Sequence, residues 1–327
     1  MRHFVQFENT GGPEVLRLVS EALAEPLPGE VRIRHTAIGV NLIDTYHRSG
    51  LYPVAQLPSP LGMEAAGVVE RVGEGVPESL TGKRVAYAGG ALGAYSTHRC
   101  VPASRLVPLP DDIDDATAAA GLLKGMTVEY LIRRAYTVAP GETVLLHAAA
   151  GGVGLIACGW LRHLGVRVIG TVGNAEKAEL ARAHGCTHPL ILGDGDFSEK
   201  VRELTGGAGV GVVYDSVGKT TFTGSLRCLK PRGLMVSFGN ASGKPDPLDI
   251  LRLADHGSLY LTRPTLAHYT ATPEELTLSA HRFFDVVRLG HVKVHVGQSF
   301  PLAQAAEAHQ RLEARQTMGS TVLVPTP

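Results

Sequence analysis

The sequence contains few cysteines, and none of them form a pair at the spacing of a metal knuckle or a redox motif. The four cysteines stand far apart and have no histidine cluster at ligand spacing beside them. We expect reduced, mostly buried thiols in a cytoplasmic protein. The first residues lack the apolar run of a secretory signal peptide, so we expect none. The cysteines are Cys100, Cys158, Cys186 and Cys228.

An excess of charge of one sign is also missing. Lysine and arginine number 31, aspartate and glutamate number 31, and no window carries five like charges. A nucleic-acid backbone would find no basic stripe on such a chain, so we expect no nucleic-acid partner. With 44% apolar and 19% charged residues, the composition excludes a disordered chain, and 327 residues suffice for two domains.

One long apolar run, residues 143–161, carries no formal charge. Its length reaches the roughly 18 residues of a membrane-span candidate. The run nevertheless contains Gly151, Gly152 and Gly154, and it changes from a β-branched stretch to a small-residue turn and then to a helical stretch. We interpret it as a strand, a turn and a helix, and we expect no membrane insertion.

The pattern of short apolar runs changes near residue 122. Before that point, β-rich runs bounded by glycine and proline predict a mostly β domain. After residue 143, six strand candidates alternate with helices, which predicts a doubly wound parallel sheet. The β-rich runs are 2–7, 31–39, 67–72, 84–88 and 94–101, and the later strands are 143–148, 167–172, 189–192, 211–215, 234–238 and 258–262.

The last part of the chain returns to mixed elements. Thr272 and Glu275 form a capping box, with a proline in the first turn, and predict a helix that ends at Gly290. We expect a β run over Val292–Val296, then a helix over 303–313 and a strand over 320–324.

A glycine-rich turn, Gly151-Gly152-Val153-Gly154, follows the first strand of the parallel sheet. Gly151 lets the backbone approach a pyrophosphate, Gly154 lets helix and strand pack closely, and the helix start supplies N–H donors. Ala149 occupies the position of the usual first glycine. Such turns also serve ordinary packing, but the strand before it and the helix after it favour dinucleotide binding.

The end of the next strand bears on which dinucleotide binds. Gly173 and Asn174 stand there, and an acid that would meet the ribose 2′-hydroxyl of NAD is missing. Lys177 lies one helical turn further and is placed to meet a 2′-phosphate; the alternative is a solvated surface lysine. The carboxylate of Glu176, if turned toward this site, would repel the phosphate. On balance we predict NADPH.

Motifs spread over the whole chain carry a family resemblance. They are Gly11–Leu16, Asn41–Pro53, Gly62–Val69, the 148–154 turn and Tyr214–Gly218. Together they resemble the zeta-crystallin-like quinone oxidoreductases of the medium-chain dehydrogenase/reductase superfamily, and the resemblance runs from residue 2 to about residue 324. It implies a GroES-like, mostly β catalytic domain (1–123 and 265–327), a Rossmann NADPH-binding domain (124–264), and the cofactor in the cleft.

The same resemblance implies the site residues. The expected catalytic group, near the nicotinamide end, is Asn41, Asp44, Tyr46 and Tyr52, of which Asn41 and Tyr46 also contact the cofactor. Relatives commonly have a phosphate-holding tyrosine where this chain has Leu192, which weakens the 2′-phosphate site. The further cofactor contacts are Lys124, Thr127 and Tyr130 at the domain junction, Gly151, Gly152, Val153 and Gly154 at the pyrophosphate, Gly173, Asn174 and Lys177 at the 2′-phosphate, and Val217, Phe238, Gly239, Asn240, Arg263 and Arg315 elsewhere.

The zinc ligands of related dehydrogenases are missing from these motifs. Val40 and Asn41 stand at the cysteine position, Met63 replaces the histidine of a His-Glu pair, and no four-cysteine lobe exists. His47 and Glu64 would be two ligands without a third, and we interpret them as polar contacts. We therefore expect no metal. Quinones and activated enones fit such a site, because they accept hydride without a Lewis acid.

The leading hypothesis is NADPH-dependent reduction of a quinone, with an enone as the alternative acceptor. A hypothesis of another class is an NADPH-bound protein without catalysis, crystallin-like or RNA-binding. The apolar edge strand Ser258–Thr262 and the relatives predict a homodimer. Tyr46 and Tyr52 either face a planar substrate or pack in the core. Asp215 ends a strand at the edge of the sheet where a ligand is expected, and its role is either to face the ligand or to support the structure. We expect surface or strand positions for His3, His98, His163, His184 and His309.

Overall fold

The computed structural model describes residues 1–326, and these form two compact units. The first unit comprises residues 1–124, 270–288 and the chain from residue 294 onward. The second comprises residues 125–269 and 289–293. Each unit has its own sheet and hydrophobic core.

Six parallel strands form one sheet in the second unit, in the order β11-β10-β9-β12-β13-β14. This is the strand order of a dinucleotide-binding, doubly wound sheet, so the predicted fold class is confirmed. The order reverses between β9 and β12, which are direct neighbours. The strands are β9 (Thr143–Leu146), β10 (Arg167–Val172), β11 (His188–Ile191), β12 (Val210–Asp215), β13 (Leu229–Ser237) and β14 (Tyr260–Thr262).

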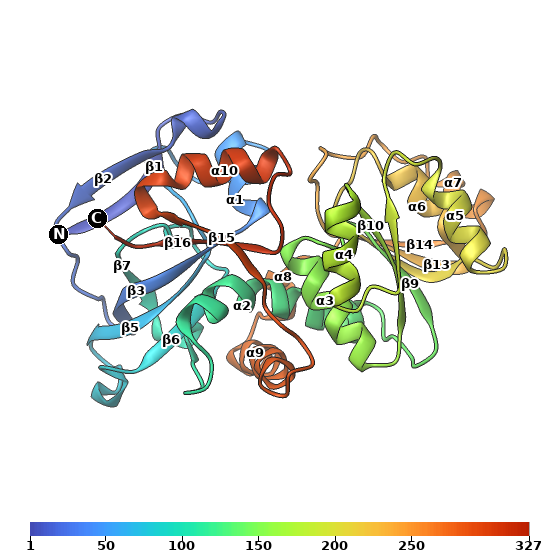
Figure 1. The fold of residues 1–327 in the computed structure, drawn as a ribbon. Helices are drawn as coiled ribbons and strands as arrows, with labels where there is room; N and C mark the ends of the chain where they lie inside the picture. The colour runs from blue at the N-terminus through green and yellow to red at the C-terminus, as the bar shows by residue number, and fades with distance from the viewer. Residues whose placement is uncertain (327) are drawn as a thin grey trace. The chain divides into compact units, whose positions relative to one another are not determined.

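Helices cover both faces of this sheet. Figure 1 shows α3 and α4 on one face and α5 and α6 on the other. The buried strand residues are β-branched or long aliphatic, and they pack against apolar helix residues such as Val201 and Leu226. The helices are α3 (Gly152–His163), α4 (Ala175–Ala183), α5 (Phe197–Leu204), α6 (Phe222–Cys228), α7 (Leu251–Asp255) and α8 (Leu266–Tyr269).

The first unit is mostly β, as predicted. Its main sheet has the order β15-β16-β3-β5-β6-β8, with β7 paired to β3, and a small sheet has the order β2-β1-β4. The long strand β3 is central because it pairs with three neighbours. The strands are β1 (Arg2–Phe7), β2 (Arg17–Glu21), β3 (Glu30–Val40), β4 (Ser59–Pro60), β5 (Glu64–Val72), β6 (Arg84–Ala88), β7 (His98–Pro102), β8 (Val107–Pro108), β15 (Val296–Pro301) and β16 (Ser320–Val324).

Four helices accompany these strands: α1 (Leu42–Ser49), α2 (Asp115–Tyr130), α9 (Pro273–Arg288) and α10 (Ala305–Glu313). The boundary between the two units falls inside α2. The capping box that begins α9 is confirmed, since Glu275 N–H donates to Thr272 Oγ1 at 3.3 Å and Thr272 N–H donates to Glu275 Oε2 at 3.4 Å.

Several predicted strands differ from the structure in their limits. The strand predicted over 258–262 begins only at Tyr260, and the strand predicted over 234–238 already begins at Leu229. Two further predictions included irregular residues. Residues 292–295 are irregular, and β15 begins only at Val296, opposite Ser320 of β16. Val292 is buried, and the boundary between the two units falls between Lys293 and Val294, within this stretch. Residues 94–97 are also irregular, apart from one bridge between Ser96 and Phe4, so β7 starts at His98.

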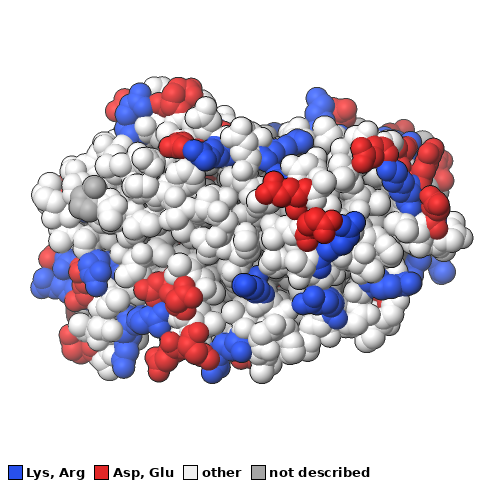
Figure 2. Space-filling model, viewed as in Figure 1, with Lys and Arg blue, Asp and Glu red and all other residues white. Residues whose placement is uncertain are grey.

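Acidic and basic side chains are interspersed on the face of the molecule shown in Figure 2, without an extended area of one sign.

The four cysteines are free thiols, and all except Cys100 are buried. None of the helices built by residues 1–326 combines the length and the hydropathy needed to cross a bilayer.

Candidate functional site

The glycine-rich turn connects β9 to α3. A Cβ on Gly154 would lie 2.3 Å from the carbonyl oxygen of Ala148, so only glycine allows this packing. A Cβ on Gly151 would meet only that oxygen, at 3.3 Å. No side chain caps α3, and the first N–H groups of a helix have no partner within it. The turn therefore presents open backbone donors at the positive end of a helix dipole, which suits a pyrophosphate.

The residues that follow β10 are small and uncharged, and the space beside them is open. Gly173 is exposed, and a Cβ there would have no atom within 4 Å. Asn174 Oδ1 caps α4 by accepting the Lys177 N–H at 2.9 Å, which fixes the helix start beside this space. Leu192 lies next to the end of β10, because its N–H donates to Val172 O at 2.9 Å. The geometry has room for a phosphate here.

The loops after β12 and β13 interlock at the same carboxyl edge of the sheet. Phe238 N–H donates to Asp215 O at 2.8 Å, and Ser242 N–H donates to Val217 O at 2.7 Å. A Cβ on Gly239 would lie 2.5 Å from Ser216 O, so this glycine permits the close approach. The expected cofactor residues Val217, Phe238, Gly239 and Asn240 are thus brought together, and Arg263 joins them by donating to Ser237 O at 2.7 Å.

A buried polar cluster marks the first unit, where β3 ends and α1 begins. Asn41 Nδ2 donates to Glu64 Oε2 at 2.9 Å, and Lys124 Nζ lies 3.5 Å from the same oxygen. Leu123 N–H donates to Glu64 Oε1 at 2.5 Å. Burial raises the pKa of Glu64, and the ammonium of Lys124 acts in the opposite direction. Asn41 and Lys124, both predicted site residues, therefore share one partner.

Asp44 is fully buried in the first turn of α1. Its Oδ2 accepts the Asn41 N–H at 2.8 Å and the Tyr95 hydroxyl at 3.0 Å, while Oδ1 has no hydrogen-bond partner. Burial raises the pKa of this carboxyl to about 7. Because the side chain has no exposed surface, it is suited to holding Asn41 in place rather than to touching a substrate.

The remaining expected site residues lie in separate places. Tyr46 and Tyr52 contact each other edge to face, with ring centroids 5.2 Å apart. Tyr130 stacks on Tyr269 in the second unit, with centroids 4.4 Å apart. Arg315 is exposed in the turn after α10, where its φ is +57°. Thr127 is buried in α2.

A zinc ion does not fit the position that related dehydrogenases use. Both oxygens of Glu64 already have partners, and its neighbours Asn41 and Met63 do not supply the expected thiolate and imidazole. Within residues 1–326, no group of three or more His, Cys, Asp or Glu side chains is arranged to hold a metal. The side chains around Glu64 are therefore unsuited to holding a zinc ion.

One histidine does not lie where the sequence predicts it, and its partners were not predicted. His309 was expected at a surface or strand position, but it is fully buried in α10. Its Nε2 lies 3.0 Å from the Tyr95 hydroxyl, and its Nδ1 lies 3.2 Å from Nη1 of Arg48. The burial of Arg48 beside α10 creates this contact, and the local sequence around either residue carries no signal of it.

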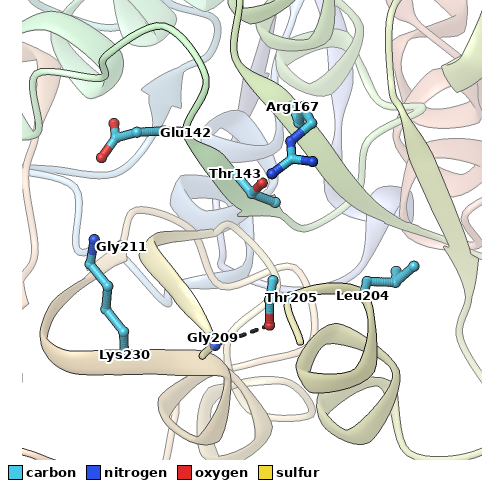
Figure 3. Close-up of a pocket in the computed structure, with 8 residues that line it drawn as sticks. All are labelled: Glu142, Thr143, Arg167, Leu204, Thr205, Gly209, Gly211 and Lys230. Atoms are coloured by element: carbon cyan, nitrogen blue, oxygen red, sulfur yellow. Dashed lines mark hydrogen bonds between the residues drawn. The ribbon is translucent and has the colours of Figure 1, made fainter. Parts of the chain in front are cut away.

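A pocket of about 240 Å³ opens at the amino ends of the strands of the parallel sheet (Figure 3). It is lined by residues at or next to the beginnings of strands, among them Thr143, Arg167, Gly211 and Lys230. Dinucleotides bind at the carboxyl ends of such strands. This pocket therefore lies at the opposite ends of the strands from the expected cofactor contacts.

The comparisons with known proteins agree with this geometry. Residues 27–111 match the alcohol dehydrogenase GroES-like domain, and residues 152–278 match the zinc-binding dehydrogenase model. A quinone oxidoreductase from Pseudomonas aeruginosa is 53% identical, covering 98% of this chain and 99% of the relative. A 2-haloacrylate reductase from Burkholderia sp. is 48% identical, with 96% of each chain covered.

The structure of Escherichia coli quinone oxidoreductase complexed with NADPH superposes with a TM-score of 0.97 at 49% identity, covering 99% of this chain and 100% of that one. Identity at this level over nearly the whole length establishes common family membership. The model described as a zinc-binding dehydrogenase matches residues 152–278, and Glu64 with its partners lies outside that match. The chain belongs to the quinone oxidoreductase family of the medium-chain dehydrogenases/reductases.

Proposed function

We propose that this protein is an NADPH-dependent quinone reductase that works without a metal. One observation carries the proposal: an uncapped, glycine-lined helix start and an open, acid-free strand end lie at the same edge of a doubly wound sheet. They suit the pyrophosphate and the 2′-phosphate of NADPH. The quinone oxidoreductases similar to this chain, one of them crystallised with NADPH, support the same function.

The chemistry of the first unit supports the acceptor class. NADPH, when bound, supplies a hydride. A quinone is already electrophilic and its reduced anion is resonance-stabilised, so positioning and hydrogen-bond donors suffice. We propose that Asn41, Tyr46 and Tyr52 provide these contacts, with Asp44 holding Asn41. A second candidate is an activated alkene, which the 2-haloacrylate reductase at 48% identity favours.

We propose that the 2′-phosphate is held by the end of β10 and the start of α4, with Gly173, Asn174 and Lys177 as its contacts. Wild-type protein should then prefer NADPH over NADH by about tenfold to hundredfold in kcat/KM, or ~1.4 to 2.8 kcal/mol. Lys177→Ala should remove most of that preference by lowering the NADPH value alone. The measurement is NADPH and NADH oxidation with 1,4-benzoquinone, 1,4-naphthoquinone, an enone and an aldehyde.

Glu179→Ala is a suitable control, because Glu179 is an exposed residue of the same helix that pairs with Arg182 at its far end. This variant should leave kcat/KM unchanged for both NADPH and NADH. Equal use of NADH by the wild type, or an unchanged NADPH value in Lys177→Ala, would refute the assignment of Lys177. Faster turnover of the enone than of every quinone would move the function to the second candidate.

We also propose a homodimer formed through the edge of the parallel sheet. β14 is the last strand of the sheet, and its residues Tyr260 and Leu261 are 63% and 39% exposed. Two edge strands joined about a two-fold axis would continue the sheet. Leu261→Lys should place like charges in that contact and shift the protein to the monomer mass in light scattering at micromolar concentration. A monomeric wild type would contradict this.

We propose a cytoplasmic location, and the state of the cysteines supports it. All four are thiols, and Cys158, Cys186 and Cys228 are buried in the second unit. Thiols stay reduced in the cytoplasm, whereas disulfides form and persist in secreted proteins.

A further inference from the structure

A fully buried hydrogen-bonded chain lies where the strand order of the parallel sheet reverses. His147 follows β9 directly, and Asp215 is the last residue of β12, the neighbouring strand. His147 is 1% exposed and Asp215 is 0% exposed. Neither side chain belongs to the proposed cofactor contacts. In doubly wound folds the dinucleotide crosses the sheet at this reversal.

The Asp215 carboxylate organises the loop that follows it. Its Oδ1 accepts the N–H groups of Val217 at 2.8 Å and Gly218 at 3.0 Å. Thr221 Oγ1 lies within 2.9 Å of both carboxylate oxygens and closes the other end of the loop. A single buried carboxylate thus determines the path of residues 216–221, including Val217.

His147 continues this chain to the next strands. Ser225 Oγ donates to Asp215 Oδ2 at 2.9 Å, so it accepts from His147 Nε2, also at 2.9 Å. The other ring nitrogen, Nδ1, must then accept the Thr171 hydroxyl at 2.8 Å. The chain therefore has one direction, from Thr171 through His147 and Ser225 to Asp215.

Thr171 joins this chain to the glycine-rich turn. Its backbone oxygen accepts the Ala149 N–H at 2.9 Å, and its hydroxyl accepts the Ala148 N–H at 3.4 Å. Ala148 has a φ of +54°, an unfavourable conformation for alanine that the surrounding bonds hold in place. The beginning of the turn and the loop after β12 are therefore fixed by one connected set of buried bonds.

We propose that Asp215 and His147 are positioning residues for NADPH, which hold the glycine-rich turn and the 216–221 loop in their binding conformations before the cofactor arrives. This inference rests on the proposed function. Preorganised loops lower the free-energy cost of binding and leave the hydride-transfer step itself unaffected. Loss of the network should therefore raise the Kd and KM for NADPH while kcat at saturating NADPH changes little.

The test compares two substitutions at one position. Asp215→Ala removes the acceptor of both loop N–H groups and should raise the Kd for NADPH by at least about tenfold, with kcat within about threefold of wild type. Asp215→Asn keeps one oxygen for those N–H groups, and its amide can donate to Ser225 if the chain reverses direction. It should remain within about threefold of the wild-type Kd. Fluorescence titration and NADPH-dependent quinone reduction give the two readouts.

Val201→Ala is the matched control for general destabilisation, because Val201 is fully buried in the same core but lies in α5. It should lower the thermal midpoint without raising the Kd for NADPH. The proposal is overturned if Asp215→Ala leaves the Kd unchanged, if Val201→Ala raises it equally, or if Asp215→Asn is as poor as Asp215→Ala.

Ser225→Ala serves if Asp215→Ala does not fold, since it cuts the link to His147 and leaves both loop N–H bonds intact. It should raise the Kd for NADPH by about threefold to tenfold, and an unchanged Kd overturns the proposal. A wild-type protein that does not bind NADPH would refute the proposed function instead, so the two failures are distinguishable.

Discussion

Gly154→Ala should lower both the stability of the protein and its affinity for NADPH. The new methyl group would lie 2.3 Å from Ala148 O and within 2.7 Å of the backbone of Ala149, where no side chain can move aside. Overpacking of this kind costs about 1 to 3 kcal/mol of unfolding free energy. The start of α3 must shift away from β9, and the turn then loses its shape. Chemical denaturation and NADPH titration measure the two effects.

Gly151→Ala separates binding from stability within the same turn. Gly151 has a φ of −80°, which alanine adopts, and its nearest contact is a single atom at 3.3 Å. The unfolding free energy of the Gly151→Ala variant should fall by less than about 1 kcal/mol. Its Kd for NADPH should rise about tenfold or more, because the methyl group occupies the approach to the backbone donors. Wild-type NADPH affinity in Gly151→Ala would mean that this turn is not the phosphate cradle.

Asp44→Asn should flatten the pH dependence of stability. The pKa of Asp44 is raised from 3.8 to about 7 by burial, so between these values the folded state holds a proton that the unfolded state has lost. The resulting stabilisation is complete below about pH 3.8 and disappears as the pH rises through 7. Between pH 5.0 and 7.5 the wild type should lose about 2 to 3 kcal/mol of unfolding free energy from this group, and the variant should not.

The comparison must be made between the two proteins at each pH, because other groups titrate in the same range. Burial lowers the pKa values of His35 and His309 to about 3, so these histidines stabilise the fold above pH 6.5 and lose that effect as the pH falls. Both are present in both proteins. Asp112→Asn is the control, since Arg288 lowers the pKa of this exposed carboxyl and it stays ionised throughout the range. A constant difference between wild type and Asp44→Asn would disprove the prediction.

The sequence by itself determined the features that depend on neighbouring residues. The strand-turn-helix around Gly151–Gly154, the strands Arg167–Val172 and Ser320–Val324, and the capping box at Thr272 all appear at their predicted positions. Each depends on backbone conformation or on hydrogen bonds within a few residues. The family resemblance added the expected site residues, because a family's motifs carry tertiary information that one sequence lacks.

Only the tertiary structure decided which polar side chains are buried together. Arg48 and His309 meet although they are 261 positions apart, and Asp44 receives the hydroxyl of Tyr95 from another segment of the first unit. His147 and Asp215 become neighbours because β9 and β12 are adjacent at the reversal of the strand order. Burial and hydrogen-bond partners follow from the packing of distant segments, so residue type and spacing alone could not assign them.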